Sequence, residues 1–116
     1  MKTNNTITIL VVDDDPMQRD VVRRLLEADG YTVKTASSAA QALACSWTPD
    51  VLLSDVQMPG MDGFALARAF HGRCPVVLMS GKFFTNRPGR LSKPFSGAQL
   101  RAAIQDALRS PKSAAA

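Results

Sequence analysis

The sequence predicts an α/β domain built on a parallel sheet with helices on both faces, and three observations support this fold class. The β-branched, nearly continuous apolar run Ile7–Val12 and the apolar run Val51–Ser54 are typical of strands buried on both faces. Segments with apolar residues at helical spacing alternate with these runs. The length of 116 residues suits one hydrophobic core. We therefore expect a single domain, residues 1–116, with its core over about 7–109 and a frayed tail at 110–116.

Five strands are expected in all. Besides the two runs above, Tyr31–Ala36 alternates between apolar and polar residues, Val76–Met79 is a further apolar run, and Leu91 lies in a short fifth strand.

Four helices are expected between and after these strands, and each begins at a residue that can cap it. The starts are Asp15 before Pro16, the capping box Ser38–Gln41, Asp62 before Gly63, and the capping box Ser96–Gln99. The first helix is expected to end at Gly30, the second at about Trp47 and the third at His71. The large side chains expected in the core are Met17, Trp47, Phe64, Phe70 and Phe95.

Charge is distributed unevenly along the chain. Residues 1–72 carry six basic and nine acidic side chains, a net of −3, whereas residues 73–116 carry eight basic and one acidic, a net of +7. The sum is the net +4 of the whole chain. A basic half can bind nucleic acid or an acidic protein, and the absence of a recognition-helix or base-stacking motif favours the protein.

Cysteine content and hydropathy indicate a cytoplasmic protein. No apolar run is long enough to cross a bilayer, and no secretory signal precedes the first strand. Cys45 and Cys74 lack metal-binding spacing, and we expect them to be reduced thiols in the core.

Chemically active side chains follow the predicted strands at their carboxyl ends. Asp13–Asp15 follow the first strand, Asp55 the third, Ser80 the fourth and Lys93 the fifth. In an open parallel sheet these ends share one edge. Clustered carboxylates repel one another, and a hard cation such as Mg²⁺ removes that cost. A carboxylate beside Mg²⁺, with a lysine and a hydroxyl nearby, suits phosphoryl transfer onto an aspartate. Asp15 is expected to act only as the helix cap.

Four segments together resemble the receiver domain of two-component response regulators. They are Val11–Asp14, Ser54–Gly63, Leu78–Gly81 and Lys93–Phe95, and the similarity extends from about Ile7 to Leu108. The resemblance implies a flavodoxin-like, doubly wound sheet of five parallel strands in the order 2-1-3-4-5.

The resemblance also implies a role for each site residue. Asp55 would accept the phosphoryl group, Lys93 would pair with a phosphoryl oxygen, and Ser80 would be the switch hydroxyl. A cis peptide bond is implied before Pro94.

The implied metal is Mg²⁺. The resemblance assigns it to Asp14 and Asp55 directly, to Asp13 through water, and to the backbone carbonyl of Gln57.

The segment between Ser80 and Lys93 departs from the family pattern. A helix of three turns needs about eleven residues, and the twelve residues Gly81–Ser92 must also supply a strand and contain Pro88 and Gly89. We therefore predict that the family's fourth helix is missing or reduced to a turn, which resembles the short-loop receivers of hybrid histidine kinases and some single-domain regulators.

Two further features of this segment are unusual. Arg90 stands where many receivers carry an aromatic switch residue, so a different readout is expected, through Arg90 or Lys82. Phe83 and Phe84 either fill the space of the lost helix or form a partner-binding patch.

The expected function is that of a phosphoacceptor that is not an enzyme acting on a separate substrate. A histidine kinase or histidine phosphotransfer domain would donate the phosphoryl group to Asp55, which would then lose it slowly by hydrolysis. The downstream protein is expected at the face formed by the 81–92 loop and the last helix, with no nucleic acid or membrane as partner. The alternatives are a basic nucleic-acid-binding module, a phosphorylation-independent pseudo-receiver, and an aspartyl-phosphate hydrolase, for which a substrate cap and an Asp-x-Asp motif at the nucleophile Asp55 are lacking. Both a stand-alone regulator and a fragment of a hybrid kinase fit the sequence.

Overall fold

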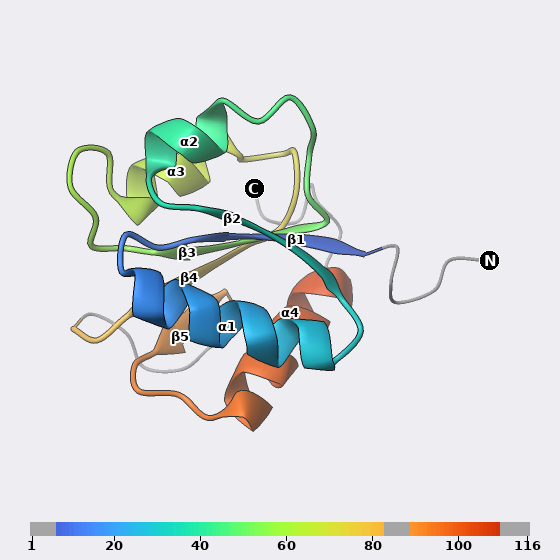
Figure 1. Cartoon of the computed structure of the whole chain (residues 1–116). Helices are drawn as coiled ribbons and strands as arrows, with labels where there is room; N and C mark the ends of the chain where they lie inside the picture. The colour runs from blue at the N-terminus through green and yellow to red at the C-terminus, as the bar shows by residue number, and fades with distance from the viewer. Residues whose placement is uncertain (1–6, 83–88, 110–116) are drawn as a thin grey trace.

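The computed structural model of the chain describes residues 7–82 and 89–109, and within them the chain forms five strands and four helices (Figure 1). The elements in chain order are β1 (Thr8–Val12), α1 (Pro16–Ala28), β2 (Thr32–Ala36), α2 (Ala39–Leu43), β3 (Val51–Asp55), α3 (Gly63–Ala69), β4 (Val76–Ser80), β5 (Arg90–Ser92) and α4 (Gly97–Arg109). None of the helices in the described residues has the length and apolar character needed to cross a membrane.

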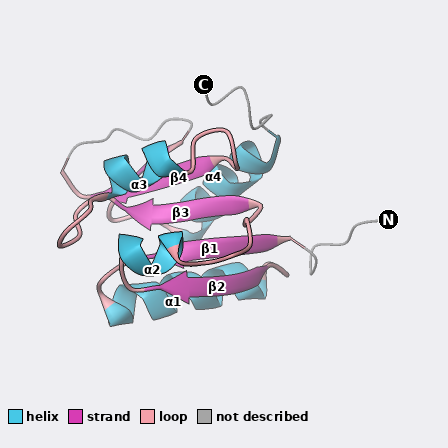
Figure 2. Cartoon of the chain, turned by 90° about the horizontal axis from the view of Figure 1, so that it is seen from above, coloured by secondary structure: helices cyan, strands magenta, loops and turns pink. Residues whose placement is uncertain are grey.

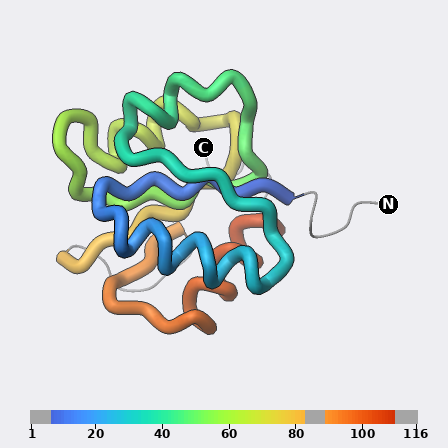
Figure 3. The backbone as a smooth tube through the Cα atoms, viewed as in Figure 1, coloured from blue at the N-terminus to red at the C-terminus, as the bar shows by residue number. Residues whose placement is uncertain are grey.

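The strands form one parallel sheet in the order β2-β1-β3-β4-β5, which confirms the predicted topology. Helices α1 and α4 cover one face, and α2 and α3 cover the other (Figures 1 and 2). The chain crosses from one face to the other between β2 and α2, as the trace in Figure 3 shows. The order of the strands reverses between β1 and β3, and in open α/β sheets ligands bind at the carboxyl ends of the strands on either side of such a point.

Alternate residues along each strand supply two separate cores. The core under α1 and α4 is built from buried side chains that include Ile9, Val11, Leu26, Leu53, Met79, Leu91 and Ile104. The core under α2 and α3 includes Leu10, Val12, Leu52, Leu66, Phe70 and Cys74. Both faces of the sheet are therefore dry around β1 and β3, which explains the continuous apolar runs in the sequence.

Helix starts lie where the capping residues predict them. Asp15 accepts a hydrogen bond from the backbone N–H of Met17 at 3.0 Å, and Asp62 accepts one from Ala65 at 2.9 Å. At α4 the capping box is reciprocal, because Ser96 Oγ accepts from Gln99 N–H and Gln99 Oε1 accepts from Ser96 N–H.

Two helices are shorter than predicted. Helix α2 ends at Leu43 instead of continuing to about Trp47, because Trp47 packs half-buried against the core and the chain must reach Asp50, whose carboxylate accepts from Thr8 N–H at 2.7 Å. Helix α3 ends at Ala69 instead of His71, since Gly72 has φ +80° and turns the chain toward β4.

The prediction of the core was correct for Phe70 and wrong for Met17. Phe70 is 1% exposed, whereas Met17 is 76% exposed. Met17, Val21 and Leu25 form one stripe along α1, and all three are exposed. Only the neighbouring stripe, Val22 and Leu26, points into the core. The apolar surface of α1 is thus wider than the surface that the sheet covers.

Nine residues, 81–89, separate β4 from β5. This is fewer than the roughly eleven that a three-turn helix needs, and the described ends of the interval, Gly81, Lys82 and Gly89, are not helical. This confirms that the helix that other receivers carry between these two strands is reduced here; it is a different helix from α4 of this chain. Phe83 and Phe84 lie outside the described residues.

Gly63, the first residue of α3, lies directly against the backbone at the end of β3. A Cβ atom at this position would overlap the carbonyl oxygen of Asp55 and lie 2.8 Å from Cα of Val56.

We expect Gly63→Ala to lower the free energy of unfolding by about 1–3 kcal/mol, the usual cost of overpacking, as measured by urea denaturation. The control is Gly97→Ala in α4, where a Cβ would make an ordinary 3.7 Å contact with Leu25; it should keep or raise the stability. Equal stability of the two variants would contradict this reading.

Candidate phosphoryl-transfer site

The predicted site residues do meet at one edge of the sheet. Asp13 and Asp14 follow β1, Asp55 is the last residue of β3, Ser80 is the last residue of β4, and Lys93 follows β5. The strands point in the same direction (Figure 2), so their carboxyl ends deliver all five residues to this edge.

The three carboxylates form a cluster that suits a metal ion. Oxygens of Asp13, Asp14 and Asp55 all lie within 4.8 Å of one another. Asp13 and Asp55 are buried, whereas Asp14 is exposed. This arrangement offers the oxygen ligands that Mg²⁺ prefers and leaves an open side for water or substrate.

Asp13 has a carboxylate oxygen that a cation would satisfy. One carboxylate oxygen, Oδ1, accepts from Asp15 N–H at 3.0 Å; the other, Oδ2, is buried and has no hydrogen-bond partner among the described residues. Burial raises the pKa of Asp13 above its ordinary value, and the charges of Asp55 and Asp14 raise it further. A bound cation would satisfy the unpartnered oxygen and remove the repulsion, so the residues present fit a metal.

Lys93 brings a positive charge to the carboxylate cluster. Its ammonium lies 2.9 Å from Asp55 Oδ1, and both side chains are largely shielded from water. The lysine is held by its backbone, since Lys93 N–H donates to the carbonyl of Ser80 at 2.9 Å. The peptide bond between Lys93 and Pro94 is cis, as predicted.

Gln18 is a residue that the sequence analysis missed. Its Oε1 accepts from Lys93 Nζ at 3.2 Å, so the ammonium is held between the amide of Gln18 and the carboxylate of Asp55. One indication of this role was available in the sequence: Gln18 lies in the first turn of α1, three residues after Asp15, so its side chain starts close to the acidic run. Its partner is 75 residues away in the sequence, and only the folded chain brings the two together.

The other predicted residues lie close by. Ser80 is fully buried, and its Oγ accepts from Lys82 N–H at 3.1 Å. Gln57 is exposed in the loop after β3, two residues beyond Asp55; the role of its carbonyl as a metal ligand stays a prediction. Asp15 caps α1, as predicted, and lies outside the carboxylate cluster.

Comparison with known proteins identifies the family. The family model of the response regulator receiver domain matches residues 9–105. The chain therefore belongs to the receiver domains of response regulators, and the predicted phosphoacceptor role in two-component signalling is that of its family. The nucleic-acid and pseudo-receiver alternatives are not favoured.

Curated relatives are longer than this chain. The DNA-binding transcriptional regulator NtrC of Escherichia coli (strain K12) is 46% identical over 77 residues, which are 62% of this chain and 16% of that protein. The response regulator MprA of Mycobacterium tuberculosis (strain ATCC 25618 / H37Rv) is 32% identical over 121 residues, covering 92% of this chain and 53% of that protein. The chain thus spans about a sixth of the first relative and about half of the second.

Solved structures of similar fold have nearly the same extent. The chemotaxis response regulator CheY4 of Vibrio cholerae has a TM-score of 0.79 at 30% identity, covering 88% of this chain and 98% of that chain. The receiver domain of the hybrid histidine kinase CckA has a TM-score of 0.74 at 36% identity, covering 88% and 99%. The predicted flavodoxin-like fold is confirmed.

The raised pKa of Asp13 leads to a prediction about metal and stability. Because the folded state disfavours the ionised carboxylate, Asp13 lowers stability at neutral pH, and this cost disappears below the ordinary pKa of about 4. Asp13→Asn should therefore raise the melting temperature by a few degrees at pH 7 in a metal chelator, and the gain should shrink as the pH falls from the raised pKa of Asp13 towards about 4.

Magnesium should stabilise the wild type more than Asp13→Asn. Added Mg²⁺ should raise the melting temperature of the wild type and have a much smaller effect on Asp13→Asn. Asp15→Asn is the matched control, since asparagine also caps helices, and it should keep the full response to Mg²⁺. An equal response in all three proteins would place the metal elsewhere.

Proposed function

We propose that this receiver accepts a phosphoryl group on Asp55, with Mg²⁺ as its metal, and passes the signal on by protein–protein contact. The observation that carries the proposal is the Asp55–Lys93 ion pair of 2.9 Å at the edge that also holds Asp13 and Asp14. A buried carboxylate that pairs with an ammonium and belongs to a metal-binding cluster suits attack on phosphorus.

The proposed chemistry needs one nucleophile and several groups that stabilise charge. A carboxylate oxygen of Asp55 attacks the phosphorus of a phosphohistidine; the P–O bond forms, the P–N bond breaks, and the leaving imidazole keeps the electron pair and takes a proton from water. The Lys93 ammonium neutralises charge on a phosphoryl oxygen, and the Ser80 hydroxyl donates to another. Held by Asp14, Asp55 and the Gln57 carbonyl, and by Asp13 through water, Mg²⁺ would supply further positive charge to the phosphoryl oxygens.

The phosphoryl group then leaves by hydrolysis. Water attacks phosphorus, inorganic phosphate is released, and the carboxylate of Asp55 is regenerated. No separate substrate is turned over, so we do not class the protein as an enzyme.

We place the phosphodonor on the exposed stripe of α1. Val21 and Leu25 line a groove together with Pro94 and Phe95, and Gln18 and Lys93 lie in the same groove. An apolar surface that leads directly to Lys93 suits a histidine kinase or a phosphotransfer domain that must bring its histidine to Asp55.

The predicted downstream face on the last helix has its charges engaged within the chain. Arg101 pairs with Asp29 at 3.1 Å, and Arg109 pairs with Asp106. An acidic partner at this face would compete with these pairs. This location stays a prediction, as does the cytoplasmic location of the protein.

The acceptor assignment is tested with a small phosphodonor. With Mg²⁺ and acetyl phosphate, the wild type should gain one phosphoryl group by intact-mass measurement, labile to base and to hydroxylamine as an acyl phosphate is. Asp55→Asn should gain none, because an amide does not attack phosphorus. Asp62→Asn, an exposed carboxylate that caps α3, serves as the control and should behave like the wild type. A phosphoryl group that persists on Asp55→Asn would refute the assignment.

The proposed docking of the phosphodonor on α1 is tested by comparing a protein phosphodonor with a small-molecule one. Val21→Asp should slow phosphoryl transfer from a histidine kinase that phosphorylates the wild type by about tenfold or more, since it places a charge in an apolar contact. The rate with acetyl phosphate should stay the same. Leu43→Asp changes a similarly exposed apolar residue on the opposite face and should alter neither rate. A slower rate with acetyl phosphate would show that Val21 acts on the site itself.

A further inference from the structure

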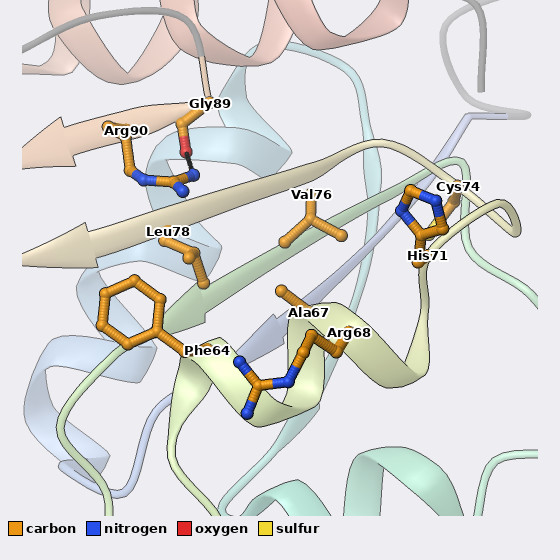
Figure 4. A pocket seen from close by; sticks show the side chains of 9 residues that line it. All are labelled: Phe64, Ala67, Arg68, His71, Cys74, Val76, Leu78, Gly89 and Arg90. Atoms are coloured by element: carbon orange, nitrogen blue, oxygen red, sulfur yellow. Dashed lines mark hydrogen bonds between the residues drawn. The ribbon is translucent and has the colours of Figure 1, made fainter. Parts of the chain in front are cut away.

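A groove of about 590 Å³ lies on the face of the sheet that carries α2 and α3. Strand β4 forms its floor, α3 forms one wall, and the start of β5 forms the other (Figure 4). Parallel sheets are stable when helices cover both faces. On this face, the described helices are α2 and α3, and neither extends over β5 (Figures 1 and 2). The groove thus occupies the place where one more helix would complete the layer.

The inside of the groove is apolar. Val76 and Leu78 of β4 point into it from the floor, and Phe64 and Ala67 of α3 line the wall (Figure 4). Leu78 is buried, whereas Val76, Ala67 and Phe64 are only partly buried. A ligand that covered these side chains would gain hydrophobic free energy in proportion to the apolar area removed from water.

The rim of the groove is basic. Arg68 is exposed on α3, His71 follows the end of that helix, and Arg90 lies across from them on β5, where its Nη1 donates to the Gly89 carbonyl at 3.1 Å (Figure 4). No carboxylate belongs to the described residues that line the groove. An apolar floor between guanidinium groups selects a ligand with one apolar face and acidic flanks.

We infer that this groove binds an amphipathic helix of a partner protein, with the apolar side of the helix on Val76 and Leu78 and its acidic flanks on Arg68 and Arg90. A helix in a groove is a common way to recognise a peptide, and a helix here would complete the layer of α2 and α3. The inference rests on the proposed function for the idea that the receiver signals through a protein, and it adds where that protein binds and its chemical class.

Charge decides between this partner and the other candidates. A second copy of the chain, placed symmetrically, would bring two identical basic rims together. The chain's own segments at 1–6, 83–88 and 110–116 carry Lys2, Arg87 and Lys112 and no acidic residue, so none of them complements the charge of the rim, although Phe83 and Phe84 match the apolar floor of the groove. Nucleic acid would match the rim but would leave the apolar floor uncovered.

The groove is also connected to the phosphoryl-transfer site. Leu78 and Arg90 are partners in the register of β4 and β5, and the next pair toward the carboxyl edge that faces the same side is Ser80 and Ser92. The floor and one wall of the groove therefore belong to the two strands that carry Ser80 and lead to Lys93. A helix bound here contacts the same rigid element as the site.

The experiment selects peptides against the unphosphorylated wild-type protein, so that its outcome does not depend on the chemistry of Asp55. The probe is a display library of helical peptides of about 16 residues, with apolar residues at i, i+3, i+4 and i+7 and all other positions random. Selected peptides should be enriched in Asp and Glu. Their binding should move the NMR signals of His71, which are easily assigned because it is the only histidine in the chain.

Charge reversals in the groove should weaken the binding. Arg68→Glu and Arg90→Glu should each lower the affinity of the selected peptides by about tenfold or more. Arg24→Glu on α1, on the other face of the sheet, is the matched control and should change it less than about twofold. Circular dichroism checks that each variant is folded. Peptides with Lys in place of Glu should bind Arg68→Glu more tightly than they bind the wild type.

Several results would overturn the inference. These are a failure to select any peptide, selected peptides without acidic enrichment, binding that leaves His71 unmoved, and equal effects of Arg68→Glu and Arg24→Glu. Displacement of the peptide by self-association of the receiver, seen by sedimentation, would assign the groove to a second copy. Tighter binding of duplex DNA at His71 would assign it to nucleic acid. The two proposals can fail separately. If acidic peptides bind the groove but Asp55 is not phosphorylated by acetyl phosphate, the groove inference holds and only the assignment of Asp55 as acceptor is refuted.

Discussion

Repulsion among Asp13, Asp14 and Asp55 is the constraint on which the carboxyl edge of this sheet depends. Two of the three carboxylates are buried, and burial disfavours their charge. Within the described residues, the Lys93 ammonium is the positive group that meets Asp55, and one oxygen of Asp13 lacks a hydrogen-bond partner. In the part of the chain that the structure describes, the three carboxylates thus outnumber the one ammonium that meets them, so a bound cation would lower the repulsion and make the site favourable for the anionic phosphoryl group.

The requirement to hold Lys93 opposite Asp55 explains much of the surrounding architecture. Strand β5 has only three residues, yet its pairing with β4 and the packing of Leu91 against the core fix the position of the lysine. On the other side, Gly63 brings α3 close to the backbone of Asp55, which leaves the end of β3 little freedom to move. The short strand and the tight glycine contact together give the ion pair a rigid setting.

The shortened connection between β4 and β5 has a different consequence. It leaves the α3 side of the sheet without a helix over β5 among the described elements, and Arg90, which stands in place of the aromatic residue of many receivers, borders the resulting groove. The basic side chains of the last helix pair with acids of the chain itself, whereas the groove combines basic and apolar surface. The charge distribution led us to expect an acidic partner at the face formed by the 81–92 loop and the last helix. The groove that we propose borders the loop side of that face, at Arg90, and not the last helix.

Local sequence was enough to predict the strands, the helix starts and the residues that meet at the carboxyl edge, among them Asp13, Asp55 and Lys93, and the family resemblance supplied the strand order. These features depend on neighbouring residues or on short motifs. A capping residue contacts the backbone within one turn of its helix, and residues that follow parallel strands come together at one edge of the sheet. The tertiary structure alone decided that Gln18 holds Lys93, that Met17 lies outside the core, and that a groove opens beside Arg90. The reason is physical: burial and long-range contacts depend on which surfaces the sheet covers, and helical periodicity identifies an apolar stripe without saying how much of it will be covered.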